Sequence, residues 1–179
     1  MYTYIALLRG INVSGKNIIK MDALRLAMQE LAYKHVRTYI QSGNIIFEST
    51  SKNTATIGTS IKEKITLNFG FNIPVVILTT NYLNQVINTN PFAIINLNKL
   101  HVTFLSAIPN QTLANKIIGT FNGDEYKIIN NQIYIHCPNG YGKTKLTNTF
   151  IEKKLQLQAT TRNWQTLIAL AEIANQTAS

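Results

Sequence analysis

The sequence has few acidic residues, a single cysteine and no long apolar run. Its 179 residues contain 8 Asp and Glu against 17 Lys and Arg, a formal net charge of +9. None of the acids falls in the segments rich in glycine and asparagine, so paired-carboxylate catalysis and carboxylate-bound magnesium have little to build on. Cys137 permits no internal disulfide, which suits a reducing compartment. No apolar run reaches the roughly 18 residues of a membrane span, and the basic residues follow the apolar N-terminal stretch, the wrong order for a signal peptide. We therefore expect a cytoplasmic protein without a membrane partner.

What the sequence does contain is enough apolar material for a folded core. Hydrophobic residues make up 45% of the chain, which argues against intrinsic disorder. In the first half, short aliphatic runs alternate with stretches in which apolar residues recur at helical spacing. Ser42-Gly43 joins two strand-like runs as a hairpin turn. The expected elements are strands at 2–8, 36–41, 44–48 and 74–79, with helices at 21–32 and around 57–65.

The second half repeats this order. A short helix at 81–88 leads through a connector to strands at 101–106, 125–129, 132–137 and 158–161. Helices are expected between them, at 113–121 and around 146–151, and a last helix begins at Trp164. Each half reads β-α-β-β-α-β, which predicts an α+β protein made of two ferredoxin-like units in tandem, with antiparallel sheets and helices on one face. The predicted boundaries are a first subdomain at 1–80, a connector at 81–99 and a second subdomain at 100–179.

Basic side chains and glycines gather in segments outside the apolar pattern. The first is the loop 9–17, and the second is 138–145, which leads into a helix. Glycine lets a backbone approach a ligand, and exposed N–H groups beside Lys or Arg suit phosphate or carboxylate. Arginine suits planar two-point recognition of such groups. The predicted anion-binding residues are Arg9, Asn12, Lys16, Asn17, Arg37, Tyr141, Lys143, Lys145 and Arg162.

Each segment also has a purely structural interpretation. The glycines can serve only to turn the chain, and Thr144 can serve as a plain helix N-cap. Gly142-Lys143-Thr144 resembles part of a phosphate loop, but Cys137 stands where that motif requires a glycine, which argues against that class of NTPase. His101 and His136 on neighbouring strands are candidates for one shared face, yet no third ligand has zinc-site spacing. We therefore expect neither a metal nor a cofactor.

The expected topology separates these segments within each unit. We expect the Arg9 loop and Arg37 at one end of the first sheet, and the Ser42-Gly43 turn at the other. In the second unit we expect the Gly140 loop and Arg162 at opposite ends. A single site that contains all of them would require the two units to bring unlike ends together.

Several strings in order also resemble a known family. The strings are LLRGINVSGKN, KMDALR, VRTYIQSGNIIF, HVTFLS, NGYGKTKL and TTRNW. Together they resemble the bacterial family of unknown function numbered 1697, over residues 4 to about 174. The resemblance implies a tandem ferredoxin-like fold and supplies no activity, cofactor or catalytic residue. The family usually has Gly-Gly where this chain has Ser14-Gly15.

Two functions follow from these observations. The first is binding of a phosphorylated or carboxylated small molecule through Arg9, Lys16, Lys143 and Arg162. The alternative is binding of RNA or single-stranded nucleic acid, which the positive charge and the sheet architecture favour. A third interpretation is that the charge only keeps the protein in solution.

Overall fold

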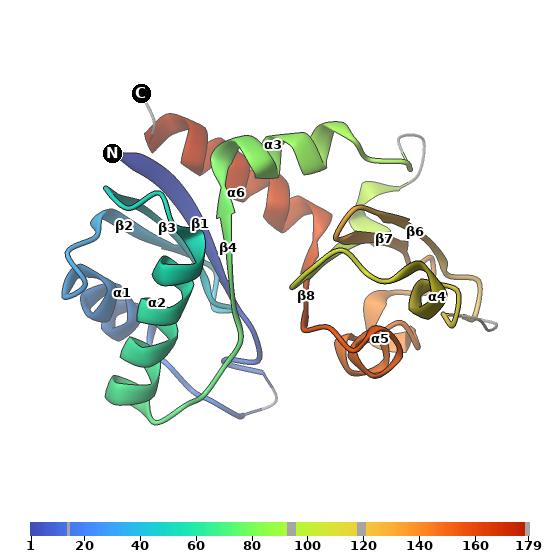
Figure 1. The fold of residues 1–179 in the computed structure, drawn as a ribbon, viewed down its shortest axis with the longest axis horizontal. Coiled ribbons are helices and arrows are strands. Elements are labelled where there is room, and N and C mark those ends of the chain that lie inside the picture. Colours follow the sequence, from blue (N-terminus) through green and yellow to red (C-terminus); the bar gives the residue numbers. More distant parts are fainter. Residues whose placement is uncertain (14, 93–95, 118–120, 178–179) are drawn as a thin grey trace. The chain divides into compact units, whose positions relative to one another are not determined.

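A computed structural model describes residues 1–13, 15–92, 96–117 and 121–177 of the chain (Figure 1). Contacts between Cα atoms divide the chain into two compact units. The first unit consists of Met1–Gln85 with Ala169–Ser179, and the second of Val86–Ile168. Helices α3 (Thr80–Asn88) and α6 (Trp164–Thr177) each contain a boundary between the two units. The boundaries expected at residues 80 and 99 stay a prediction.

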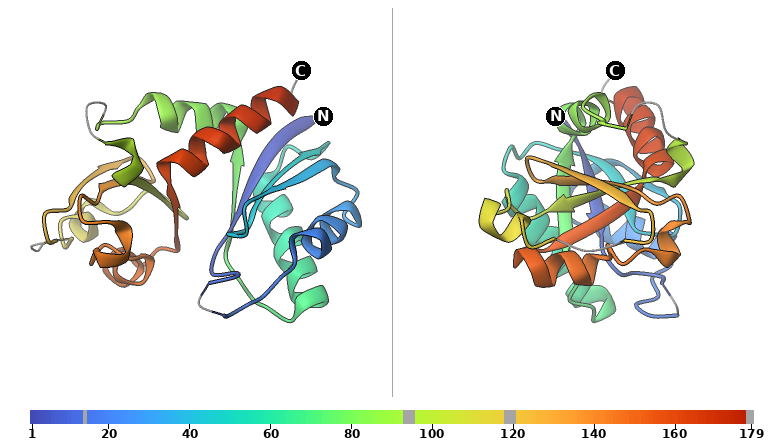
Figure 2. Two further views of the ribbon diagram at one scale, coloured as in Figure 1. Left: turned by 180° about the vertical axis from the view of Figure 1, so that it is seen from behind. Right: turned by 90° about the vertical axis from the view of Figure 1, so that its right-hand side faces the viewer.

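The first unit contains a four-stranded antiparallel sheet in the order β2-β3-β1-β4. Its elements are β1 (Tyr2–Leu8), α1 (Met21–Gln29), β2 (Lys34–Tyr39), β3 (Asn44–Ser49), α2 (Thr54–Phe69) and β4 (Val75–Thr79). Helices α1 and α2 lie against one face of this sheet, as Figures 1 and 2 show from two sides. The Ile57, Ile61 and Ile65 stripe of α2 is buried there against Phe47 and Ala6 of the strands. Burial of this stripe explains why a four-residue repeat of isoleucine forms a helix at this place.

The second unit repeats the same architecture, with the strand order β6-β7-β5-β8. Its elements are β5 (Leu100–Leu105), α4 (Gln111–Ala114), β6 (Glu125–Ile129), β7 (Gln132–His136), α5 (Asn148–Leu155) and β8 (Ala159–Asn163). The α+β class and the tandem ferredoxin-like units predicted from the sequence are thereby confirmed. The helix expected over 113–121 is a single turn that ends at Ala114, and residues 118–120 of that expectation lie outside the described part. Ile117 and Phe121 are buried without belonging to a helix.

Two pairs of backbone hydrogen bonds show how closely the units correspond. At the end of β1, the Leu8 amide donates to Gly43 O at 2.8 Å, and in the second unit the Leu105 amide donates to Asn131 O at 2.9 Å. The next residue in each unit, Arg9 or Ser106, donates its amide to the residue just before the last strand of the unit (3.1 and 3.0 Å). The loop after β1 therefore corresponds to the loop after β5, and both lie at the hairpin end of their sheet.

The second face of each sheet is buried as well. In the first unit Ile5, Leu7 and Ile46 alternate with the residues that face α1 and α2, and each is fully buried. In the second unit Val102 and Tyr134 are equally inaccessible. The central strands of each sheet are therefore buried on both faces, whereas the edge strands β2 and β6 are partly exposed.

No helix among the described residues is both long and apolar enough to cross a membrane.

Candidate functional site

The loop after β1 is a folded structure held by the side chain of Asn12. Asn12 Nδ2 donates to Ile19 O and to Gln41 O, both at 2.9 Å, and Oδ1 accepts from the Ile19 amide at 2.8 Å. The residue adopts a left-handed backbone with φ 54°, a conformation that asparagine tolerates better than most residues. Asn17, with φ 49°, donates its Nδ2 to Gly10 O at 2.8 Å. Both asparagines predicted to bind a ligand therefore hold the loop together.

The expected separation of this loop from the Ser42-Gly43 turn is wrong. Strands β1 and β2 both pair antiparallel with β3 and are therefore parallel to each other, so they end at the same edge. The contact is close: a Cβ built on Gly43 would lie 2.8 Å from Leu8 Cβ and 2.8 Å from Ile11 Cδ1. With φ +78°, Gly43 also has a backbone that other residues rarely adopt.

The basic residues of the first unit are spread over this structure. Lys16 is exposed in the loop, whereas Arg9 is partly buried and engaged in other interactions. Arg37 is exposed on the edge strand β2. It pairs with Ile46, which lies midway along β3, so Arg37 is not at the end of the sheet. The structure thus brings Asn12, Lys16 and Asn17 together, and it leaves Lys16 as the predicted cation exposed in that loop.

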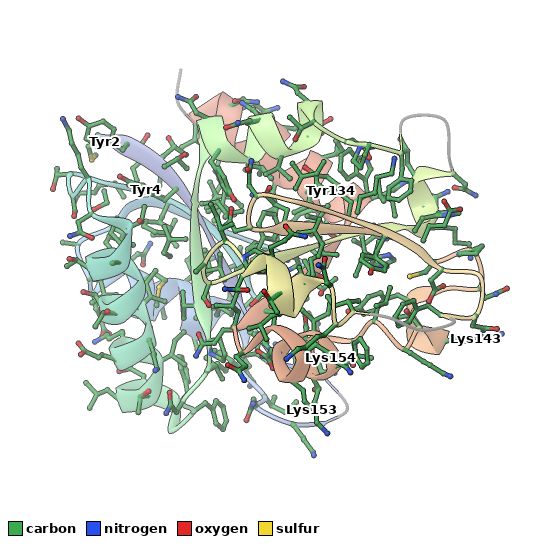
Figure 3. All side chains as sticks on the ribbon, turned by 45° about the vertical axis from the view of Figure 1, so that its right-hand side comes forward. Tyr2, Tyr4, Tyr134, Lys143, Lys153 and Lys154 are labelled. Atoms are coloured by element: carbon green, nitrogen blue, oxygen red, sulfur yellow. The ribbon has the colours of Figure 1, made fainter. Side chains whose placement is uncertain are left out.

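The Gly140 loop of the second unit begins at the end of β7. The Cys137 amide donates to Lys99 O, the Gly140 amide to Cys137 O and the Lys143 amide to Gly140 O, at 2.9 to 3.0 Å. Gly140 has φ 92° and ψ 145°, a region that only glycine readily occupies. A short 3-10 helix, η2 (Tyr141–Lys143), follows, and Lys143 and Lys145 are exposed. Figure 3 shows Lys143 at the periphery of this unit.

An aromatic stack fixes the other predicted residue of this loop. The rings of Tyr141 and His101 lie 4.5 Å apart between centroids, with an interplanar angle of 23°. His101 Nε2 also lies 3.4 Å from Asn163 Nδ2 at the end of β8. Burial lowers the pKa of His101 below its ordinary value, against the opposing effect of a hydrogen bond with the Lys99 backbone. A neutral imidazole therefore supports Tyr141 at neutral pH.

The predicted N-cap of the following helix is also in a different place. Thr147 caps α5, because its Oγ1 accepts from the Phe150 amide at 3.2 Å. Thr144 is buried, and its Oγ1 accepts from the Leu146 amide at 3.0 Å. Thr144 therefore orders the end of the loop without capping a helix.

Arg162 does not reach this loop, although it comes to the same end of the sheet. Strands β7 and β8 are parallel to each other because both pair antiparallel with β5, so the expectation of opposite ends is wrong. Arg162 pairs with Val102, whereas Asn163 pairs with His101, and neighbouring residues of a strand face opposite sides. Arg162 is 9% exposed and donates from Nη1 to Thr161 O at 2.9 Å. Burial lowers its pKa to about 10, as expected for a charge withdrawn from water.

The histidines and the cysteine do not combine into a metal site. His136 pairs with Leu100, so His101 and His136 point to opposite faces of the sheet, contrary to the expected shared face. No group of three His, Cys, Asp or Glu side chains within the described ranges is placed to hold a metal. Burial, together with the charge of Asp124, raises the pKa of Cys137 to about 11, so the thiolate that reactions require is scarce.

Sequence reasoning missed the neighbours of Tyr141. The sequence indicates His101 as a candidate for a face shared with His136, and its pattern places neither His101 nor Asn163 beside the Gly140 loop. Asn163 caps α6, since its Oδ1 accepts from the Gln165 amide at 2.9 Å. These neighbours could have been found from the strand directions. Because β7 and β8 are parallel to each other, the residues that follow both strands lie at the same end of the sheet.

Fold and loops together define a tandem ferredoxin-like α+β protein with a basic loop at the end of its second sheet. The chain belongs to the family described as "Protein of unknown function (DUF1697)", whose model matches residues 1–134. The match ends before the Gly140 loop and Arg162.

Among solved structures, the chain is similar to the conserved bacterial protein SP0830 from Streptococcus pneumoniae. The TM-score is 0.77 at 22% identity, and the alignment covers 97% of this chain and 98% of the other. At this identity the similarity concerns the fold. A comparison with curated proteins gave no match.

Proposed function

We propose that this protein binds an anionic small molecule, phosphorylated or carboxylated, at the Gly140 loop. The observation that carries the proposal is the exposure of Lys143 and Lys145 on a loop whose backbone is fixed by hydrogen bonds and by the Tyr141–His101 stack. A loop that is already ordered loses little backbone entropy when a ligand binds, and the remaining entropic cost is that of the two lysine side chains. Residues 137–147 themselves contain no Asp or Glu, and the carboxylate beside the loop is that of Asp124, next to Cys137.

The residues assigned to the site change accordingly. Arg162 is buried on the other face of the sheet, and Asn12 and Asn17 are engaged within their own loop. We therefore assign the anion to Lys143 and Lys145, with Tyr141 as a supporting residue. Lys16 offers a separate cation in the first unit.

The expected affinity is low and depends on salt. Exposed ion pairs contribute roughly 0.2–1 kcal/mol each, so two lysines supply at most about 2 kcal/mol. Because a Kd of 1 mM corresponds to about 4.1 kcal/mol, we expect a Kd above about 1 mM. Charges at the surface are screened over about 8 Å at physiological ionic strength. Binding should therefore weaken clearly as salt is raised.

A small ligand is favoured over the nucleic-acid alternative by the burial of both sheets. Ferredoxin-like RNA-binding domains stack bases on aromatic side chains of an open sheet face. Here Phe104 and Tyr134, on the face of the second sheet that does not face α5, are at most 1% exposed, and Ile5, Leu7 and Ile46 on the corresponding face of the first sheet are fully buried. Lys143, Lys153 and Lys154 are among the lysines that remain as support for a polyanion, and Figure 3 shows them in the second unit. The single buried Cys137 supports our further proposal of a reducing, cytoplasmic location.

The test is an NMR titration of the ¹⁵N-labelled full chain with inorganic phosphate, pyrophosphate and citrate at low salt. We expect saturating shifts of the Gly140, Gly142 and Lys143 amides, and a Kd raised at least about fivefold in the double variant Lys143→Gln/Lys145→Gln. Lys153→Gln removes one charge from the same unit outside the loop and serves as the control.

Two results would contradict the proposal. One is the absence of saturating shifts at these amides, and the other is a double variant that binds as tightly as the unmodified chain. Tighter binding of oligouridine, with a log–log salt slope of about −0.7 per neutralised phosphate, would establish the nucleic-acid alternative instead.

A further inference from the structure

A hollow of about 670 Å³ lies in the first unit, at the end of the sheet remote from the hairpin turn. The first residues of β1 form one side of it, and the junction of β4 with α3 contributes Thr79, Thr80 and Asn81. Met1, Glu48 of β3 and Thr177 of α6 complete the lining. Its volume lies within the range of small-molecule sites. The Gly140 loop occupies the corresponding end of the second unit, so both candidate sites use the same end of a repeated architecture.

The lining is rich in neutral hydroxyl groups and has one carboxylate. Hydroxyls come from tyrosine and threonine side chains, Asn81 adds an amide, and Glu48 is the acid. Among the described residues that line the hollow, none has an arginine or lysine side chain. The chemistry is therefore the opposite of that at the Gly140 loop: it accepts hydrogen bonds from a ligand and offers no cationic side chain to an anion.

Glu48 is held in a defined orientation at this hollow. It pairs with Thr3 across the β1–β3 ladder, and its Oε2 lies 2.9 Å from His35 Nδ1. The Glu48 side chain is 13% exposed, so water competes weakly for it. Among the described residues, the Glu48 side chain has His35 as its hydrogen-bond partner, through Oε2. Its other oxygen, Oε1, can therefore accept a hydrogen bond from a ligand. A carboxylate on a strand is a strong and well-placed acceptor for hydroxyl donors.

Asn81 and Tyr2 supply the other two kinds of contact. Asn81 is exposed at the first turn of α3, where its amide can both donate and accept. Tyr2 is 44% exposed, so its ring offers an apolar surface with a polar tip. The nearby threonines are engaged in the fold: Thr79 Oγ1 accepts from the Tyr82 amide at 3.1 Å, and Thr80 Oγ1 donates to Thr3 O at 3.4 Å. Figure 3 shows Tyr2 and Tyr4 at the beginning of β1.

The charges around the hollow favour a neutral ligand over an organic cation. The Lys52 ammonium lies over the Tyr2 ring, 5.3 Å from its centroid, so an organic cation at that ring would meet a like charge, whereas a neutral ligand would not. Glu48 is paired with His35. Tyr4 closes the wall, because it is buried and its hydroxyl donates to Ser51 O at 2.8 Å. A ligand with several hydroxyl groups and a flat apolar face matches what remains.

We propose that this hollow binds a neutral polyhydroxylated ring, a sugar, through hydrogen bonds to Glu48 and Asn81 and packing against Tyr2. The ring comes either from a free glycoside or from the ribose of a nucleoside. The site lies wholly within the first unit and is independent of the anion proposed for the Gly140 loop.

The experiment is saturation-transfer NMR on the full chain with methyl α-D-glucopyranoside, methyl β-D-ribofuranoside and adenosine, with choline as the cationic comparison. We expect transfer to the sugar protons, and a Kd raised about tenfold by Glu48→Gln, as expected for loss of one charge-assisted hydrogen bond. Asn81→Ala should raise the Kd about fivefold through loss of a neutral hydrogen bond. Because Asn81 is exposed, this variant keeps its fold. Glu63→Gln, which removes an exposed carboxylate from α2, is the matched control and should bind like the unmodified chain.

Each outcome decides the proposal. Transfer to the methyl glycosides supports a free sugar, and transfer to adenosine alone, strongest at its ribose protons, supports a nucleoside. Absence of transfer to all three compounds, binding unchanged in both Glu48→Gln and Asn81→Ala, or tighter binding of choline than of any sugar overturns it.

Discussion

Asn12→Ala should destabilise the first unit strongly, although the residue lies in a surface loop. Its side chain makes three hydrogen bonds, at 2.8 to 2.9 Å, to the backbone of Ile19 and Gln41. They join the loop after β1 both to its own far end and to the β2–β3 turn. Removing the side chain therefore releases two connections at once.

The magnitude follows from counting these contacts. A typical intramolecular hydrogen bond contributes about 1 kcal/mol net, so the three together give about 3 kcal/mol. Alanine at φ 54° adds about 1 kcal/mol. Water replaces part of the lost bonding at the exposed Gln41 carbonyl, which leaves an expected loss of about 3 kcal/mol in the free energy of unfolding. That is a large share of the roughly 5–15 kcal/mol that stabilises a domain.

Urea unfolding followed by far-UV circular dichroism measures this loss. Asn12→Gly removes the same hydrogen bonds but tolerates the left-handed backbone, so it should lose about 1 kcal/mol less than Asn12→Ala. Phosphate binding at the Gly140 loop should be unchanged in both variants. A loss below about 1 kcal/mol in Asn12→Ala, or weaker phosphate binding at unaltered stability, would refute the structural role and restore Asn12 as a ligand contact.

Two further predictions use the same instruments. Gly43→Ala should lower the free energy of unfolding by about 2–4 kcal/mol, because the new Cβ would lie 2.8 Å from Leu8 Cβ and the left-handed backbone adds its own cost. Gly10→Ala, with φ +71° and open space around it, should show the backbone cost alone. Equal losses in the two variants would refute the steric argument. The free energy of unfolding should fall as pH drops below 6.5, the ordinary pKa of histidine, because the unfolded chain protonates His101 while the folded pKa is lower. His101→Phe should keep the stack on Tyr141 and reduce this dependence, and an unchanged pH profile would remove His101 as its source.

The elements of the fold could be predicted because their patterns are local. Strands such as Tyr2–Leu8 follow from short apolar runs, and the Ser42-Gly43 turn, with Gly43 at φ 78°, follows from a residue that tolerates a left-handed backbone. The prediction of a helix that reaches Phe121 is wrong. Ile117 and Phe121 are buried although their backbone is irregular, and their spacing in the sequence matches that of a helix.

The candidate site was harder to predict because it depends on strand direction. Strands parallel to each other without being neighbours, β1 with β2 and β7 with β8, place their following loops at one edge. The relative direction of these strands follows from the order of elements, but the loop positions expected from the sequence did not take it into account. Whether a polar side chain serves the loop or a ligand has no local signal: Asn12 and Lys16 stand in the same glycine-rich loop, and only the structure separates them.

The corrected edges also change which loops are comparable. The Arg9 loop lies at the hairpin end of the first sheet, whereas the Gly140 loop lies at the other end of the second, so the two are not equivalent parts of the repeat. The counterpart of the Gly140 loop is the segment that follows Glu48 and Ser49 at the end of β3. The repeated architecture thus presents cations at this end in one unit and a carboxylate with hydroxyl groups in the other. If both proposals hold, one end of the duplicated fold has diverged to bind two ligands of different charge, and the variants Lys143→Gln/Lys145→Gln and Glu48→Gln should each weaken one binding event without affecting the other.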